Sequence, residues 1–228
     1  MKRVFTYLHY FLYTAFYWNI GIAAYILYYD IKGEKKYHIH TSGVNELKHL
    51  KKEGIDTSAT TIYTAASYPL LDYTFQHLPP SSRNHFIDIG CGMGRTMCVA
   101  AHYGFKKVSG IDFSKKFCDI AKDNLAITHQ MEPSFDFNVI NKNALNFEIP
   151  SDADCLFFFN PFNETVMKKV INNVMKSLKK KPHDLYIAYV NPLYKDLWIK
   201  AGFSEIYHTQ KLRYIEESIF YYHVEMHS

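Results

Sequence analysis

The sequence predicts an α/β protein with a doubly wound, mostly parallel sheet of seven strands, an antiparallel final hairpin and an N-terminal helical extension. From His85 onward, short apolar runs alternate with segments of helical periodicity, as in parallel sheets with right-handed crossovers. The run at 154–159 is almost continuously apolar, as a strand covered on both faces requires. Two aromatic-rich stretches close the chain and are suited to pair as a hairpin.

The alternation gives each element an expected boundary. Strands are predicted at 85–90, 107–112, 135–140, 154–159 and 185–190, with the hairpin strands within 203–213 and 217–225. Helices are predicted at 94–103, 114–127, 163–178 and 193–201. Together they form one domain over residues 85–228, in a chain long enough to enclose a full hydrophobic core.

Residues 37–84 are expected to be a transitional region with a cap helix. Short strands or loops and a helical turn near 45–53 make up the first part. The cap helix is predicted over 63–78, with Pro69 near its start, where a missing backbone N–H costs little. A linker that begins with two prolines follows it.

Residues 1–36 are predicted to form an apolar helix, because 4–29 carry no charged side chain. That length suffices to cross a bilayer, although tyrosines and other polar groups dilute the hydrophobicity. At 100° per residue, Tyr7 and Tyr10 fall on a different face from Leu8. A two-faced helix suits packing on the protein itself or lying at a membrane surface better than spanning. These three arrangements stay open, and membrane contact through 4–29 is one of them.

The amino-acid composition indicates in which cellular compartment the protein works and which classes of partner are not expected. Hydrophobic residues make up 48% of the 228 residues and charged residues 21%, which is ordinary for a globular protein. The net charge of +4 is mild and scattered, so a nucleic-acid partner is not expected. Four cysteines without a C-x-x-C pair indicate reduced thiols of a cytoplasmic protein, placed at the inner face of a membrane if the N-terminal helix touches lipid. His38 and His40 lack a third ligand nearby, so no metal site is predicted.

The most informative motif is Asp88-Ile-Gly-Cys-Gly-Met-Gly94, between an apolar run and a helix-forming segment. A strand that ends in glycines and opens into a helix presents backbone N–H groups to the polar part of a nucleotide-like ligand. The spacing is G-x-G-x-G and lacks the third glycine of the dinucleotide fingerprint G-x-G-x-x-G. About twenty residues later a second strand ends in Asp112, whose carboxylate is suited to two ribose hydroxyls.

This combination resembles motif I and the following acidic motif of the class I S-adenosylmethionine-dependent methyltransferases. The resemblance runs from about Tyr63 to the C-terminus and implies a Rossmann-like sheet, S-adenosylmethionine as cofactor and methyl transfer as activity. The cofactor-binding residues that it implies are Asp88, Gly90, Cys91, Gly92, Met93, Gly94, Asp112, Phe113, Asn143 and Ala144.

Within this set, Asp88 is expected at the ammonium of the methionine moiety, Asp112 at the ribose and Phe113 against the adenine. Asn143 has two interpretations: a hydrogen-bond acceptor for the adenine amine or a plain turn asparagine. Tyr63 and Tyr68, on the cap helix, are expected as a cofactor lid.

Asn160-Pro161-Phe162, directly after the fourth strand, provides the predicted catalytic residues. In an open α/β sheet the carboxyl ends of strands face the ligand. The tripeptide resembles the N-P-P-Tyr or N-P-P-Phe motif of methyltransferases that act on amide or amine nitrogens, but it lacks the second proline. Carbonyl oxygens of Asn160 and Pro161 would orient the nitrogen, and Phe162 would line its slot. The other interpretation is a proline-stopped strand with a buried asparagine cap.

The function expected from these features is N-methylation of a protein side chain such as lysine. A small molecule, a lipid-linked amine or a nucleic acid is the alternative acceptor. A cofactor-binding protein without transferase activity is the alternative from another class. A methyl group on a sulfonium needs little acid–base assistance, and no residue stands out as a base.

Overall fold

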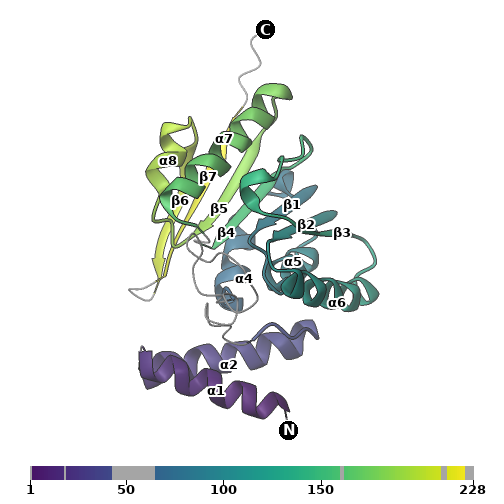
Figure 1. Cartoon of the computed structure of the whole chain (residues 1–228), viewed down its shortest axis with the longest axis vertical. Helices are drawn as coiled ribbons and strands as arrows, with labels where there is room; N and C mark the ends of the chain where they lie inside the picture. The colour runs from purple at the N-terminus through teal and green to yellow at the C-terminus, as the bar shows by residue number, and fades with distance from the viewer. Residues whose placement is uncertain (1, 18, 43–64, 160–161, 212–214, 224–228) are drawn as a thin grey trace.

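A computed structural model of the chain describes residues 2–17, 19–42, 65–159, 162–211 and 215–223. Figure 1 shows a twisted sheet with helices on both faces, and an N-terminal pair of helices at one end of the molecule. The seven strands have the order β3-β2-β1-β4-β5-β7-β6. They are β1 (His85–Ile89), β2 (Lys107–Asp112), β3 (Asp136–Asn141), β4 (Cys155–Phe159), β5 (Leu185–Val190), β6 (Ser204–Lys211) and β7 (Ile215–Tyr222). The first five are parallel, and β7 runs antiparallel between β5 and β6.

Helices cover both faces of the sheet, so the core has two layers. The helices of the domain are α4 (Tyr68–His77), α5 (Arg95–His102), α6 (Lys115–Met131), α7 (Glu164–Lys180) and α8 (Lys195–Lys200), with short 3₁₀ helices η1 (Pro80–Ser82) and η2 (Ala144–Asn146). Adjacent strand residues serve opposite layers: Phe86 packs with α4, α5 and α6, whereas Ile87 packs with α7 and α8. This period of two confirms the doubly wound α/β prediction.

The domain elements begin and end close to the predicted positions. β2 and β5 have the predicted bounds. The largest extension is that of α6, which continues from the expected end at 127 to Met131, because Leu125 and Thr128 are buried against the sheet. The cap helix starts at Tyr68 and not at 63 as predicted, because Ser67 is extended and Pro69 is tolerated only in the first turn of a helix. The turn predicted near 45–53 lies outside the described residues.

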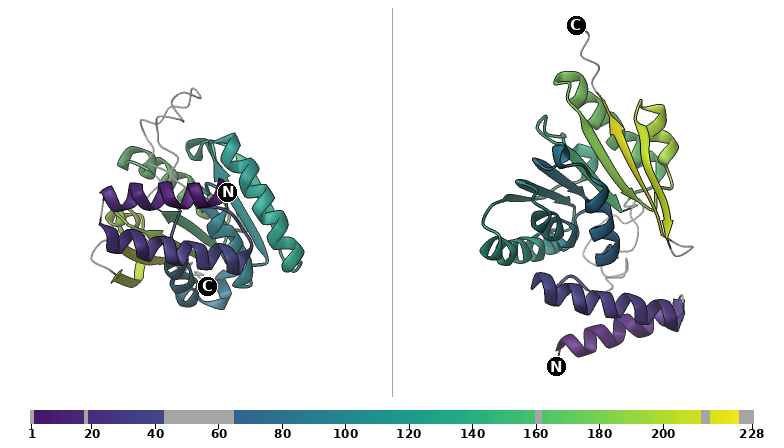
Figure 2. Two further views of the ribbon diagram at one scale, coloured as in Figure 1. Left: turned by 90° about the horizontal axis from the view of Figure 1, so that it is seen from below. Right: turned by 180° about the vertical axis from the view of Figure 1, so that it is seen from behind.

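The N-terminal extension forms two helices, α1 (Lys2–Tyr17) and α2 (Ile20–Tyr37), so the prediction of one helix was wrong. The physical reason is Asn19, whose backbone is extended and whose side-chain oxygen accepts a hydrogen bond from the Ile22 N–H at 2.8 Å. This N-cap starts a new helix. The two helices lie side by side beneath the domain (Figure 2). No helix in the described part of the chain is long and apolar enough to cross a membrane.

Candidate cofactor and active site

The glycine loop between β1 and α5 has a backbone that favours glycine at three positions. Gly90, Gly92 and Gly94 have φ angles of 90°, 51° and 83°, in the left-handed region. The loop is held against the end of β2, because the N–H groups of Gly90 and Cys91 donate to the Ile111 carbonyl at 2.8 and 3.0 Å. The predicted strand–loop–helix context is therefore present.

Asp112 joins the glycine loop to the start of α6. One carboxylate oxygen accepts the Gly92 N–H at 3.0 Å, and the other accepts the Ser114 N–H at 2.8 Å. The side chain lies at the carboxyl end of β2 and is almost completely buried. Burial raises the pKa of Asp112, and the two backbone hydrogen bonds lower it. The effect of burial is larger, so the pKa is about 6. Each oxygen keeps a lone pair for a further donor, such as a ribose hydroxyl.

Asp88, near the end of β1, is the second buried carboxylate of the site and is only 3% exposed. Burial, followed by the charge of Asp112, raises the pKa of Asp88 to about 8, and a hydrogen bond with Thr96 opposes this shift. Two neighbouring carboxylates in a low dielectric favour the arrival of a cation, which stabilises their ionised forms. The ammonium of an amino-acid moiety has the required charge.

A small apolar cluster adjoins Asp112 where the resemblance places the adenine. Phe113 packs with Met93, Phe117 and Ile120. The side-chain amide of Asn141 donates to the Asp112 carbonyl at 3.0 Å and to the Phe113 carbonyl at 2.8 Å. The sequence prediction missed Asn141, although its place at the end of the third predicted strand is a usable signal.

Three predicted residues are engaged with the protein itself. Cys91 is buried in the core layer of α5 and α6, against Gly110. Asn143 caps η2, because its side-chain oxygen accepts the Leu145 N–H at 2.9 Å. Ala144 packs against the layer of α7. The turn interpretation of Asn143 therefore describes this structure, and its contact with adenine stays a prediction.

The predicted acceptor residues are only partly described. Asn160 and Pro161 lie outside the described residues. Phe162 is 9% exposed and packs in the core layer between the sheet and α7. Of the two predicted lid tyrosines, Tyr63 lies outside the described residues and Tyr68 is buried.

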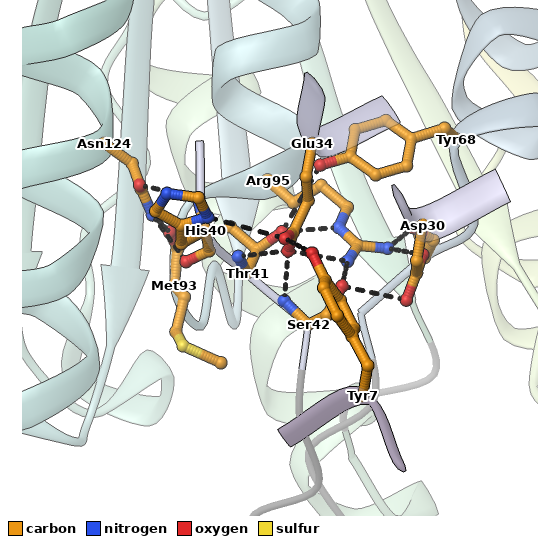
Figure 3. A network of polar contacts seen from close by, with 11 residues as sticks. Tyr7, Asp30, Glu34, His40, Thr41, Ser42, Tyr68, Met93, Arg95 and Asn124 are labelled. Carbon is orange, nitrogen blue, oxygen red and sulfur yellow. Dashed lines mark hydrogen bonds and ion pairs between the residues drawn. The ribbon is translucent and has the colours of Figure 1, made fainter. Parts of the chain in front are cut away.

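Arg95, the first residue of α5 after the glycine loop, lies at the centre of a buried polar network (Figure 3). Its guanidinium donates to the Asp30 carboxylate at 2.7 Å, to the Thr41 hydroxyl at 2.7 Å and to the Ser42 hydroxyl at 3.0 Å. The Tyr68 ring lies 4.4 Å from the guanidinium carbon. Tyr68 supports Arg95 in this structure, and a lid movement stays a prediction.

Glu34 extends this network to α1. One carboxylate oxygen accepts the backbone N–H groups of Thr41 and Ser42 at 2.7 and 2.6 Å, and the other accepts the Tyr7 hydroxyl at 2.5 Å. Burial acts to raise the pKa of Glu34, but these hydrogen bonds outweigh it and the pKa is lowered. Glu34 is therefore a buried, ionised partner of Arg95, 3.9 Å from its guanidinium.

Asn124 of α6 connects the same segment to the glycine loop itself. Its amide nitrogen donates to the Met93 carbonyl at 2.9 Å and to the His40 carbonyl at 3.2 Å. Its oxygen accepts the His40 N–H at 3.1 Å. The N-terminal segment is therefore bonded to the end of the loop where α5 begins, directly at Arg95 and through Asn124 at Met93. The sequence prediction missed this role of Asn124, Asp30 and Glu34, although two acids at the end of an apolar helix are a signal.

In the described ranges, no three His, Cys, Asp or Glu side chains cluster as metal ligands. The four cysteines are free and buried.

Comparisons with known proteins agree with this geometry. Residues 86–181 match the family model described as "Methyltransferase domain". Among solved structures, a SAM-dependent methyltransferase from Aquifex aeolicus has a TM-score of 0.54 at 12% identity, covering 78% of this chain and 98% of that one. An RNA methyltransferase from Salinibacter ruber, in complex with S-adenosyl-L-homocysteine, has a TM-score of 0.51 at 12% identity, covering 69% and 93%. The StiE O-MT has a TM-score of 0.52 at 10% identity, covering 68% and 73%. A comparison with curated protein sequences gave no match.

The matched family model spans β1 to the end of α7, and so includes the glycine loop and Asp112. The seven-stranded sheet with its antiparallel last pair continues beyond it. Residues 86–181 therefore form a methyltransferase domain, on the Rossmann-like fold that S-adenosylmethionine-dependent methyltransferases of known structure share.

Proposed function

We propose that the protein methylates a nitrogen of a protein side chain such as lysine. The observation that carries this proposal is the sequence Asn160-Pro161-Phe162 directly after β4. β4 pairs in parallel with β1, with Phe157 opposite Asp88, so β4 ends at the same edge of the sheet as the glycine loop. A carbonyl-rich tripeptide that follows a strand at this edge suits the orientation of an N–H group beside the cofactor.

The residues around the cofactor have distinct tasks. S-adenosylmethionine supplies a methyl group on a positively charged sulfur, so alignment and exclusion of water account for most of the acceleration. Asp88 holds the amino-acid ammonium, and Asp112 holds the ribose while it keeps the glycine loop in place. The buried positions of both carboxylates fit these tasks, because a charged or hydrogen-bonding ligand replaces the water that they have lost.

The acceptor side needs a nitrogen with a free lone pair. Carbonyl oxygens of Asn160 and Pro161 accept N–H groups and direct that lone pair toward the methyl carbon. The C–N bond forms as the C–S bond breaks, and the sulfur takes the bonding electron pair. A lysine amine enters deprotonated, having lost its proton to solvent, and the product is a methylammonium that carries the positive charge the sulfur has lost. Phe162, the last residue of the tripeptide, is buried in the core layer of α7 and anchors the chain shortly after β4.

Other acceptors have support of a different kind. The similar structures include an RNA methyltransferase and an O-MT, so the fold serves several acceptor classes. A small molecule, a lipid-linked amine or a nucleic acid is therefore the alternative acceptor. A cofactor-binding protein without transferase activity is the alternative from another class. The buried thiols fit a reducing compartment, and we place the enzyme in the cytoplasm.

The test follows a radiolabelled methyl group from S-adenosylmethionine into a lysate of the source organism, separated into protein, nucleic acid, lipid and small-molecule fractions. Label in a few protein bands supports the proposal, and acid hydrolysis then identifies methyl-lysine. The Asn160→Ala variant should retain S-adenosylhomocysteine binding and lose transfer. Label in the nucleic-acid, lipid or small-molecule fraction would show that the acceptor belongs to one of the alternative classes. If the protein binds the cofactor but no fraction is labelled, the non-catalytic alternative is favoured.

A further inference from the structure

Exposed apolar side chains are concentrated on the N-terminal hairpin. Of the fourteen large hydrophobic side chains that are exposed in the described part of the chain, nine belong to α1, α2 and their junction. They are Phe5, Leu8, Leu12, Phe16, Tyr17, Ile20, Tyr25, Tyr28 and Ile31. A soluble surface rarely gathers so many in one place without an interaction to serve.

Four of these side chains form an apolar stripe along α1. Phe5, Leu8, Leu12 and Phe16 recur at helical spacing, within one arc of the helix at 100° per residue. Tyr10 and Thr14, on the opposite side of α1, are buried. Figure 1 shows α2 between α1 and the domain, so the stripe faces away from the sheet.

The charges of the hairpin are sorted by sign. Asp30 and Glu34, the only carboxylates that the sequence places in α1 and α2, are buried in the Arg95 network. Lys32, Lys35 and Lys36 are exposed. Two further cations, Lys2 and Arg3, belong to the first turn of α1 by sequence. The solvent face of the hairpin is therefore apolar, aromatic and basic, and the part of it that the structure describes exposes no carboxylate.

We propose that the apolar stripe of α1 docks on the surface of an anionic lipid bilayer. Apolar side chains on one face of a helix, with cations and no exposed carboxylate nearby, are the features of an interfacial helix. Lys36 lies 3.9 Å from the Asp72 carboxylate, which leaves Lys32 and Lys35 as the other exposed cations of α2. A second copy of the chain would cover the apolar stripe but would bring these like charges together. An anionic bilayer would cover the stripe and attract the cations.

Docking of the apolar stripe on a bilayer would place the cofactor edge of the sheet on the membrane side of the enzyme. Asp30 of α2 is bonded to Arg95 at the start of α5, and Asn124 is bonded to the carbonyl of Met93 in the glycine loop. The hairpin is thus attached at the edge of the sheet where β1 ends. A bilayer beneath α1 lies on the same side of the molecule as that edge.

The experiment is cosedimentation of the full chain with vesicles of phosphatidylcholine and phosphatidylglycerol, compared with vesicles of phosphatidylcholine alone. We expect binding to the anionic vesicles that weakens as salt is raised, because exposed cations contribute. In the Leu8→Glu/Leu12→Glu variant, the partition coefficient should fall by at least about tenfold, because two apolar contacts are lost and two like charges approach the lipid. Both positions are exposed, and Glu keeps the helix propensity of Leu.

The matched control is Ile199→Glu/Ile206→Glu, on α8 and β6. These side chains are 47% and 50% exposed, against 51% and 58% for Leu8 and Leu12. The control should bind vesicles as the wild type does. Thermal unfolding and S-adenosylhomocysteine binding confirm that both variants fold. Failure of the folded wild type to bind anionic vesicles would overturn the proposal, as would equal loss in both variants. A concentration-dependent dimer in sedimentation equilibrium that only Leu8→Glu/Leu12→Glu abolishes, without vesicle binding, would assign the stripe to a second copy.

Discussion

Asp88 and Asp112 are buried carboxylates with raised pKa values, and this makes the cofactor site sensitive to pH. Burial raises the pKa of Asp88 to about 8 and that of Asp112 to about 6. The folded, cofactor-free protein therefore holds these protons more tightly than the unfolded chain. Their contribution to stability is complete below the ordinary carboxyl pKa of about 4 and is lost as pH rises through about 6 and about 8.

We predict that the unfolding free energy of the cofactor-free protein falls between pH 5 and pH 8 more steeply in the wild type than in Asp88→Asn. The variant lacks the group with the larger shift, so its curve should be flatter. Thermal unfolding at a series of pH values measures both curves. Parallel curves for the two proteins would contradict the assignment of this titration to Asp88.

Ligand binding should reverse the protonation of the same group. An ammonium beside Asp88 favours the ionised carboxylate, so S-adenosylhomocysteine binding at pH 7 should release up to about one proton. Calorimetric titrations in two buffers of different ionisation enthalpy measure this release. The observed enthalpies should differ for the wild type and converge for Asp88→Asn. Equal enthalpies in both buffers for the wild type would place the ammonium elsewhere.

At the scale of elements, the junction of the glycine loop with α5 sets how closely α5 and α6 approach. A Cβ atom on Gly94 would lie 3.0 Å from the Ala121 Cβ and 3.2 Å from the Ala121 Cα. Gly104 has the same φ of 83°, but nothing lies within 4 Å of its Cβ position. The two glycines therefore share the backbone conformation and differ in the space around them.

We predict that Gly104→Ala costs about 1 kcal/mol of stability, from the left-handed backbone alone. Gly94→Ala should cost about 1–3 kcal/mol more, because α6 must move. Gly94→Ala should also weaken S-adenosylhomocysteine binding, whereas Gly104→Ala should leave it unchanged. Urea unfolding gives the stability difference, and equal losses in the two variants would show that the α5–α6 contact is not tight.

The sequence predicted the domain elements well because their signals are local. The apolar run of β5 and the glycines before α5 define boundaries without knowledge of the rest of the chain. The break at Asn19 was missed because the apolar pattern continues on both sides of it, and only the capping conformation ends α1. Asn143 was ambiguous for a similar reason: one acceptor oxygen fits either a 3₁₀ cap or an adenine amine.

Contacts between distant segments were less accessible from the sequence. The positions of Arg95 and Asp30 differ by 65, and nothing in their local patterns shows that they meet. Asn124 joins His40 to Met93 from the middle of a helix, where a polar residue ordinarily faces solvent. Asn141 is exposed, yet it donates to two carbonyls beside Asp112. Such roles depend on tertiary packing, so the motif alone could not reveal them.

At the scale of the whole molecule, the Arg95 network attaches the N-terminal hairpin to the cofactor domain. Both members of the Arg95–Asp30 pair are almost completely buried, at 2.7 Å. Arg95→Met should lower the unfolding free energy by about 3–5 kcal/mol, because Asp30 and Glu34 would keep buried charge without a cation. Chemical denaturation monitored by tyrosine fluorescence and circular dichroism measures this loss.

The control is Lys115→Met, which removes the exposed ion pair with Asp119 at 2.6 Å. Solvent screens that pair, so its loss should leave the unfolding free energy nearly unchanged. A similar small cost for Arg95→Met would mean that the hairpin is not attached through this network. Unfolding of Arg95→Met in two separate transitions would instead support the attachment, since hairpin and domain would then lose their coupling.

The most direct test of the whole account is calorimetric titration of S-adenosylhomocysteine into the wild type and Asp112→Asn. We expect saturable one-to-one binding by the wild type. The affinity of the variant should be lower by about tenfold to a hundredfold, since hydrogen bonds to a charged acceptor are lost while the side-chain volume is kept. No binding by the folded wild type, or the same affinity in Asp112→Asn, would contradict the assignment of this edge of the sheet as the cofactor site.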